Sequence, residues 1–202
     1  MAERRKKPIP YFDSNVILDY IRKRRNDSVL LLETIKRRKL RSWSSFYMLL
    51  ELTDKEQENK WIWKRAQKGE TLDDILRTRY PRNLTKDELR AVYDEIIEKF
   101  MTDFIVSDII YVNIPSNEDW DEILQLMVES NISIADSIHV IAAINSGCNV
   151  FITRDSQLTQ IIHGLESKWK IKLPVSDPQN LDKVLSNNMI MPIIPNGHDG
   201  SK

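Results

Sequence analysis

The sequence predicts an α/β domain with a mostly parallel sheet. Short apolar segments alternate along the chain with longer segments in which apolar residues recur at three- and four-residue steps. Such alternation of strands and helices is typical of a parallel sheet covered by helices. Hydrophobic residues make up 41% of the 202 residues, close to the share in an ordinary globular domain. We therefore expect one compact domain with a buried core rather than a disordered chain.

The expected strands are short and apolar. The first ends on an acidic residue, Asp13, and Pro115 ends the third. In chain order, the expected strands are residues 9–13, 40–44, 111–114, 150–153 and 173–176.

The helices between these strands are predicted from apolar spacing and from start and stop signals. Asp27 or Ser28 can cap the second helix, and Gly147 lies where glycine often ends a helix. The expected helices comprise residues 14–25, 27–39, 45–58, 119–130 and 134–146.

Residues 57–106 interrupt this alternation and predict a helical insertion. Thr85 and Glu88 fit a capping box, and the apolar spacing after them predicts a helix of about 20 residues, on the order of 30 Å long. The preceding segment, which contains Trp61 and Trp63, predicts one or two shorter helices. The insertion either packs on its own domain or offers a surface to a partner. We expect a basic arm at residues 1–8, a domain at 9–186 that contains this insertion, and a tail at 187–202.

The zero net charge of the chain conceals two segments of opposite charge. Residues 1–41 carry 13 Lys and Arg against 5 Asp and Glu, a net charge of +8, and the remainder carries −8. The basic residues cluster at 4–7, at 22–25, and at 36–39 with Arg41. They suit either the ends of helices or a surface that faces a polyanion, and three clusters in one short stretch favour the second interpretation.

Several classes of protein are excluded by composition. The chain has five glycines and contains neither a dinucleotide-binding nor a P-loop motif. Its single cysteine, Cys148, permits no internal disulfide and no cysteine metal cluster. No apolar run approaches the roughly 20 residues needed to cross a bilayer, and the N-terminus does not resemble a signal peptide. We expect a cytoplasmic protein that does not span a membrane.

Four acidic residues occur where the chemistry of a site is expected. Asp13 and Asp155 follow predicted strands, Glu51 lies in the early turns of the helix after the second strand, and Asp136 begins a helix. Ligands of open parallel sheets bind at the carboxyl ends of the strands, where these four side chains can meet. Clustered carboxylates repel one another, and a hard cation such as Mg²⁺ or Mn²⁺ relieves the repulsion. Such an ion activates water and stabilises the charge that builds up on a phosphodiester.

Each of these acids also has a purely structural interpretation. Asp13 and Asp155 can cap the helix or turn that follows a strand, and Ser133 with Asp136 can form a capping box. Glu51 can belong to a solvated polar stripe of its helix.

Several motifs together resemble the PIN-domain nucleases. The resembling segments are residues 11–18 (YFDSNVIL) for the opening strand, 135–143 (ADSIHVIAA) for the third acidic motif, 149–155 (NVFITRD) for the fourth, and 173–178 (LPVSDP) for the last strand. Glu51 matches the second acid of that family. The resemblance covers residues 9–56 and 107–186, whereas the insertion departs from compact members.

The resemblance implies a metal-dependent ribonuclease similar to the VapC-like toxins of toxin–antitoxin pairs. It implies a three-layer α/β/α fold with a central sheet of about five strands, commonly as a homodimer, and an antitoxin as a partner. The implied metal-binding and catalytic residues are Asp13, Glu51, Asp136 and Asp155, which would hold one or two Mg²⁺ or Mn²⁺ ions. Asn15 and Thr153 lie on matching motifs and could orient a carboxylate or a water.

Other residues could be functional, but each also has a simpler structural interpretation. His139 follows Asp136 on the same helix face, and we expect it to be a structural histidine. Trp61 and Trp63, near several lysines and arginines, predict either anchors of the insertion or a platform for unpaired bases.

The leading hypothesis is an endoribonuclease that uses Mg²⁺ or Mn²⁺ and whose basic clusters bind the RNA backbone. The alternatives are a PIN-fold RNA- or protein-binding module with little or no nuclease activity, and a structure-specific DNA nuclease.

Overall fold

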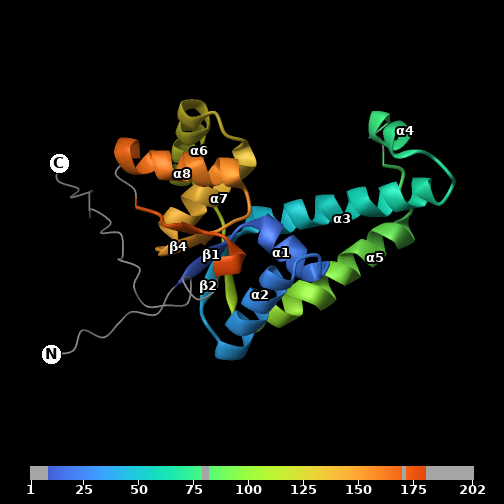
Figure 1. The fold of residues 1–202 in the computed structure, drawn as a ribbon, viewed down its shortest axis with the longest axis horizontal. Helices are drawn as coiled ribbons and strands as arrows, with labels where there is room; N and C mark the ends of the chain where they lie inside the picture. Colours follow the sequence, from blue (N-terminus) through green and yellow to red (C-terminus); the bar gives the residue numbers. More distant parts are fainter. Residues whose placement is uncertain (1–8, 79–81, 170–171, 181–202) are drawn as a thin grey trace.

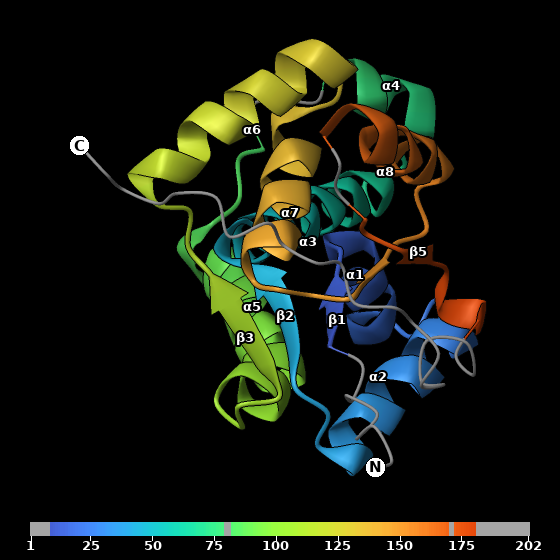
Figure 2. The same cartoon turned by 90° about the vertical axis from the view of Figure 1, so that its left-hand side faces the viewer.

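Five parallel strands form a single sheet in the computed structural model, which describes residues 9–78, 82–169 and 172–180. The strand order is β3-β2-β1-β4-β5, and every neighbouring pair is parallel. Figure 2 shows β3, β2 and β1 side by side. The strands are β1 (Pro10–Phe12), β2 (Ser42–Ser45), β3 (Ile110–Asn113), β4 (Val150–Ile152) and β5 (Val175–Ser176). The predicted basic arm and C-terminal tail lie outside the described residues.

Helices cover both faces of this sheet, which confirms the predicted three-layer α/β/α fold (Figure 1). The helices that precede β3 in the chain are α1 (Ser14–Ile21), α2 (Asn26–Arg38), α3 (Phe46–Ala66), α4 (Leu72–Arg77), α5 (Lys86–Ile96) and the π-helix η1 (Ile97–Ile105). The later elements are α6 (Asn117–Ser130), α7 (Ile134–Asn145), α8 (Ser156–Trp169) and the 3₁₀ turn η2 (Pro178–Asn180). No helix in the described residues is long and apolar enough to cross a membrane.

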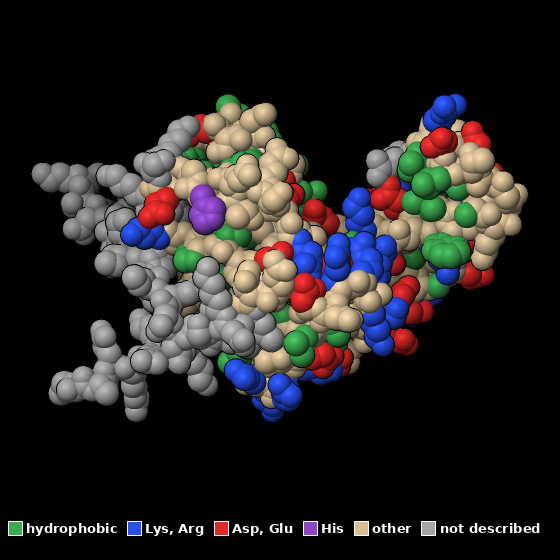
Figure 3. Space-filling model, viewed as in Figure 1, with side chains coloured by type: hydrophobic (Ala, Val, Ile, Leu, Met, Phe, Trp, Pro, Cys, Tyr) green, Lys and Arg blue, Asp and Glu red, His purple; other side chains and the backbone are tan. Residues whose placement is uncertain are grey.

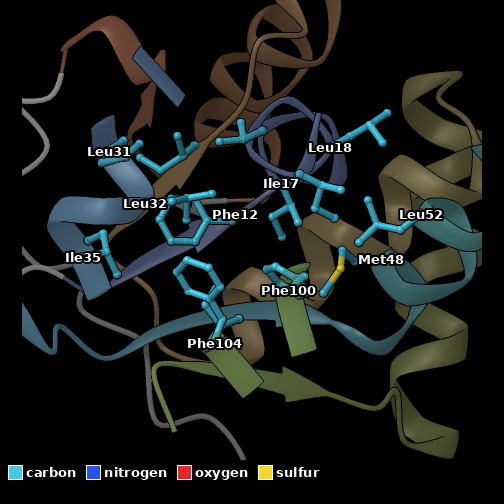
Figure 4. Packing of buried hydrophobic residues seen from close by; sticks show 14 of the residues in the cluster. Phe12, Ile17, Leu18, Leu31, Leu32, Ile35, Met48, Leu52, Phe100 and Phe104 are labelled. Atoms are coloured by element: carbon cyan, nitrogen blue, oxygen red, sulfur yellow. The ribbon is translucent and has the colours of Figure 1, made fainter. Parts of the chain in front are cut away.

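The core is divided by the sheet into two apolar clusters. Along β1, Tyr11 belongs to the cluster under α6, α7 and α8, whereas Phe12 belongs to the cluster under α1, α2, α3 and η1. In β4, Phe151 belongs to the same cluster as Tyr11, and its neighbour Ile152 belongs to the same cluster as Phe12. Successive side chains of a strand point to opposite faces, so each central strand contributes to both clusters. Figure 4 shows the cluster that contains Phe12, in which Phe100 and Phe104 lie near Phe12.

The insertion forms an arm that extends from the domain (Figure 1). Its first part continues α3 without a break to Ala66, so the predicted helix end near Glu58 is wrong. One shorter helix is present as predicted, but it is α4, which begins only at Leu72 and excludes Trp61. Residues 58–66 contain neither glycine nor proline, and the side chain of Trp61 is only 4% exposed. The helix therefore has no local reason to stop.

The return helix of the arm has the predicted length but two different hydrogen-bond patterns. Thr85 and Glu88 form the predicted capping box, with Glu88 Oε2 accepting from the Thr85 N–H at 2.6 Å. The hydrogen bond from that N–H, together with Lys64, lowers the pKa of Glu88 to about 2. After Ile96 the helix continues as η1, which the sequence analysis did not foresee, and η1 places Phe100 and Phe104 in the core.

α8 covers residues 156–169, for which no helix was predicted. The buried side chains Leu158, Ile162 and Leu165 recur at helical spacing, and Asp155 binds the first backbone N–H groups of this helix. The signal for α8 was therefore present in the sequence.

We expect Phe100→Ala to lower the free energy of unfolding by about 3–5 kcal/mol, because its ring is fully buried and stacks on Phe104. Urea unfolding measures the change. The matched control is Tyr93→Ala, which removes a 54% exposed ring from the same arm and should change stability by less than about 0.5 kcal/mol. Equal effects of the two variants would show that the arm does not pack on the core as described.

Candidate functional site

Asp13 is buried at the carboxyl end of the central strand β1. Its side chain is 5% exposed, and its backbone N–H donates to Ile152 O on β4 at 3.0 Å. Asp13 occupies the N-cap position of α1, but its carboxylate makes no capping hydrogen bond. The structural interpretation as a helix cap therefore does not explain this side chain.

Two polar side chains hold one oxygen of the Asp13 carboxylate. Asn15 Nδ2 and Thr153 Oγ1 each donate to Asp13 Oδ2 at 2.6 Å, and Asn15 Nδ2 also lies 3.1 Å from Thr153 Oγ1. The other oxygen, Oδ1, has one long contact within the described residues, 3.4 Å from Ser14 Oγ. Asn15 and Thr153 thus fix the carboxylate through Oδ2 and leave Oδ1 largely without donors.

Glu51 reaches the same region from the second turn of α3. Its Oε2 lies 2.7 Å from Nε2 of His139, which is 1% exposed. His139 Nδ1 in turn faces Tyr11 Oη at 2.9 Å and Ser45 Oγ at 3.3 Å. The imidazole is therefore a buried structural group that fixes the Glu51 carboxylate. The Glu51 carboxylate is therefore not fully solvated, in contrast to its interpretation as part of a solvated polar stripe.

The neighbouring acids of α3 are directed elsewhere. Asp54 pairs with Arg82 at 2.6 Å, Glu56 with Arg22 at 2.6 Å, and Glu58 with Lys55 at 3.2 Å.

Asp136 lies in the first turn of α7 and is half-buried. Ser133 Oγ accepts from the Asp136 N–H at 3.0 Å and donates to Asp136 Oδ2 at 2.7 Å. Ser133 therefore caps α7, but the predicted capping box is incomplete, because Asp136 accepts from the Ser133 hydroxyl and not from its backbone N–H.

The charges of these acids act on one another across the edge of the sheet. Burial raises the pKa of Asp13, and the charges of Glu51 and Asp136 raise it further, although His139 and Thr153 act in the opposite direction. Burial alone would lower the pKa of His139, but the hydrogen bond to Glu51 and the three carboxylates outweigh it. The net effect is a raised pKa for the imidazole. The charges of Asp13, Glu51 and Asp136 thus all act on His139.

Asp155 has a different environment from the other three acids. It is exposed, and its Oδ1 accepts from the Gln157 and Leu158 N–H groups at 2.8 and 2.9 Å. Its backbone N–H donates to Thr153 Oγ1 at 3.0 Å, which links it to Asp13 indirectly. Its carboxylate therefore caps α8, as the structural interpretation predicted.

Within the described parts of the chain, no three Asp, Glu, His or Cys side chains are arranged to hold a metal ion. The cause is visible in the contacts, since Glu51 is turned to His139 and Asp136 to Ser133. The donor chemistry nevertheless fits Mg²⁺ or Mn²⁺, because both prefer carboxylate oxygens. Each of these contacts uses one carboxylate oxygen, Glu51 Oε2 or Asp136 Oδ2. An ion bound beside Asp13 would be held by the other oxygens or after these contacts are exchanged.

The strand order gives this location further significance. Chain connections run from β1 outward to β2 and β3, whereas β4 and β5 lie on the other side of β1. Ligands of open parallel sheets bind at such a reversal, outside the carboxyl ends of the strands. Asp13 follows β1 and Thr153 follows β4, so both flank this point.

Sequence reasoning missed Arg154, which joins several elements beside the site. Its guanidinium contacts Asp19 on α1 at 2.8 Å, Asp27 on α2, and Asp177 after β5 at 3.5 Å. Its backbone N–H donates to Asn15 Oδ1 at 3.3 Å, and so supports the residue that holds Asp13. The signal in the sequence was Asp19, an acid within an apolar helix face, because a buried carboxylate requires a cationic partner.

Cys148 is buried, and burial raises the pKa of its thiol to about 12. This agrees with the interpretation of Cys148 as a small core residue rather than a nucleophile.

No protein-family model, no curated protein and no solved structure matches the chain. The resemblance to PIN-domain nucleases therefore stays a prediction, and the geometry described above carries the functional argument.

We expect Arg154→Met to lower the free energy of unfolding by about 2 kcal/mol at pH 7. Burial favours a higher pKa for Asp27, but the hydrogen bonds from Arg154 and from the Ser28 N–H outweigh it and the pKa is lowered. A lowered carboxyl pKa stabilises the fold above the unfolded-state pKa and loses this contribution as the pH falls through the folded-state pKa. The difference between parent and variant should therefore shrink between pH 5 and pH 3.

Urea unfolding at several pH values measures this difference. Arg38→Met, which alters an exposed cation at the end of α2, is the control and should have little effect at any pH. A difference for Arg154→Met that is the same at pH 3 and pH 7 would contradict the ion-pair explanation.

Proposed function

We propose that the chain is a metal-dependent endoribonuclease whose reactive centre is built around Asp13, Glu51 and Asp136. One observation carries the proposal: a buried carboxylate at the point where the strand order reverses, with its pKa raised by burial and by two further carboxylates. A group of this kind is costly without a cation, and perturbed acids of this kind concentrate at functional sites.

The chain supplies the positioning for such a centre. Asn15 and Thr153 hold Asp13 Oδ2, which directs Oδ1 away from them. His139, fixed by Tyr11, holds Glu51 in reach of the edge of the sheet. A bound Mg²⁺ or Mn²⁺ would supply an activated water and would stabilise charge on the phosphate. Asp155 remains the fourth proposed acid, adjacent to Thr153.

The choice of RNA as substrate is supported by the motif resemblance and by the net charge of +8 on residues 1–41. The same resemblance supports the further proposals of a toxin in a toxin–antitoxin pair, a homodimer, and a cytoplasmic location.

A nucleic-acid-binding module without nuclease activity is the second candidate. The contacts of Glu51 with His139 and of Asp136 with Ser133 favour it, because they occupy the carboxylates that a metal would need. Cleavage measurements separate the two candidates.

We expect Asp13→Asn, Glu51→Gln and Asp136→Asn each to reduce cleavage of a labelled single-stranded RNA in Mn²⁺ by about 100-fold or more. Asp121→Asn is the matched control, because Asp121 is exposed on α6, and it should cut at the parental rate. Thermal unfolding checks the fold of Asp13→Asn, which should be retained because the neutral side chain avoids a buried charge.

Parental cleavage rates for all three site variants would disprove the proposed centre. A parent that binds RNA but does not cut it would favour the binding module. DNA of the same sequence, assayed in parallel, tests the choice of RNA, and faster cleavage of DNA would contradict it.

A further inference from the structure

A groove lies where the arm leaves the domain. It encloses about 780 Å³ and is lined by side chains of α1, α2, α3, α5 and η1. Figure 3 shows Lys and Arg side chains gathered where the arm leaves the domain. The volume is in the usual range of ligand sites, about 300–1,000 Å³. We call it the arm groove.

An exposed indole stands on the wall of the arm groove. Trp63 is 65% exposed, and Lys60 precedes it by one helical turn on α3. Trp61 differs, since it is 4% exposed and lies under the guanidinium of Arg65 at 5.2 Å. Of the two tryptophans, Trp61 is therefore an anchor of the arm, and Trp63 offers an open aromatic face.

The lining of the arm groove carries four Lys or Arg and four Asp or Glu, but most of these carboxylates are already paired. Three of its carboxylates are already paired: Glu56 with Arg22, Glu95 with Lys99, and Asp103 with Lys36. A fourth, Glu33, accepts a hydrogen bond from Tyr20 Oη at 2.7 Å. Lys23 and Lys60 also line the groove and have no ion-pair partner among the described residues. Two lysines therefore face one uncompensated carboxylate.

Lys23 occupies an unusual backbone position. It follows the end of α1 with a φ of 51°, a left-handed conformation that helices commonly give to glycine at this position. Lys23 is exposed and lines the arm groove.

Basic residues connect the arm groove to the edge of the sheet where Asp13 lies. α1, which is eight residues and about 12 Å long, lies between Asp13 and Lys23. A smaller cavity of about 320 Å³ between them is lined by Asn15, Asp19, Arg24, Arg25 and Arg154. Arg24 and Arg154 pair with Asp19, whereas Arg25 has no ion-pair partner in the described residues.

We propose that the arm groove binds single-stranded RNA. One base stacks on Trp63, and the phosphates on either side of it lie near Lys23 and Lys60. Stacking is available only to an unpaired base, and the combination of an open indole with unpaired cations is typical of surfaces for single strands. The strand continues past Arg25 towards Asp13, so the inference rests on the proposed function for the identity of the substrate.

Fluorescence anisotropy of a labelled 12-nucleotide RNA tests the groove, with every variant carrying Asp13→Asn so that the RNA stays intact. We expect Trp63→Ala to weaken binding about tenfold or more. Lys23→Gly with Lys60→Gln should weaken it and reduce the slope of log Kd against log salt by about 1 to 1.5, because two phosphate contacts are lost. Duplex RNA should show none of these differences.

Matched controls exist for each substitution. Asn131 also has a left-handed backbone, with a φ of 51°, at the end of α6, and Lys172 is an exposed lysine outside residues 1–41; neither lines the arm groove. Asn131→Gly and Lys172→Gln should therefore leave RNA affinity and salt slope unchanged. Trp120→Ala removes a 41% exposed indole from α6 and should likewise have no effect. Lys23→Gly should not lower the unfolding temperature, since glycine suits that backbone conformation.

Different outcomes overturn the proposed function and the proposal that the arm groove binds RNA. If the groove variants bind RNA within twofold of the Asp13→Asn parent, or if that parent binds no RNA, the inference is overturned. If Trp63→Ala instead abolishes self-association or binding of a protein partner while RNA affinity is unchanged, the groove is a protein interface and the inference is again overturned. A wild-type chain that never cuts RNA, with groove variants that lose binding, would overturn only the proposed function.

Discussion

The burial of one carboxylate, that of Asp13, is the constraint on which the rest of the site depends. A carboxylate at 5% exposure requires donors, and Asn15 in α1 and Thr153 after β4 provide them. Because both donors bind the same oxygen, the second oxygen stays available. Glu51 and Asp136 add negative charge to this region instead of relieving it. The charge of His139 offsets part of this repulsion, and the proposed cation would relieve it further.

The fold makes this concentration of acids possible. In a parallel sheet every strand ends at the same edge, so short segments after β1 and β4 meet although about 140 residues separate them. The helix after β2 begins at that edge and brings Glu51, and the start of α7 brings Asp136. The same helix, α3, continues into the arm and forms one wall of the arm groove. One element thus connects the acids to the proposed binding surface.

Sequence reasoning predicted most of the fold, because the strands are short apolar segments and the helix ends carry clear signals at Thr85 and Gly147. It missed α8, although buried apolar residues recur there at helical spacing. It also ended α3 too early, near Glu58, where neither glycine nor proline stops the helix. The four candidate acids could be identified from their positions in the sequence, but the side chains that they contact could not. The contacts of Glu51 with His139 and of Arg154 with three acids join residues 23 to 135 positions apart, and local patterns do not encode them.

Soaking crystals of the protein in Mn²⁺ and locating the ion by its anomalous scattering tests the central claim most directly. The account predicts a peak within coordinating distance of carboxylate oxygens of Asp13, Glu51 and Asp136, with Glu51 released from His139 or Asp136 released from Ser133. The absence of a peak at this edge of the sheet, with both of those contacts intact at saturating Mn²⁺, would contradict it.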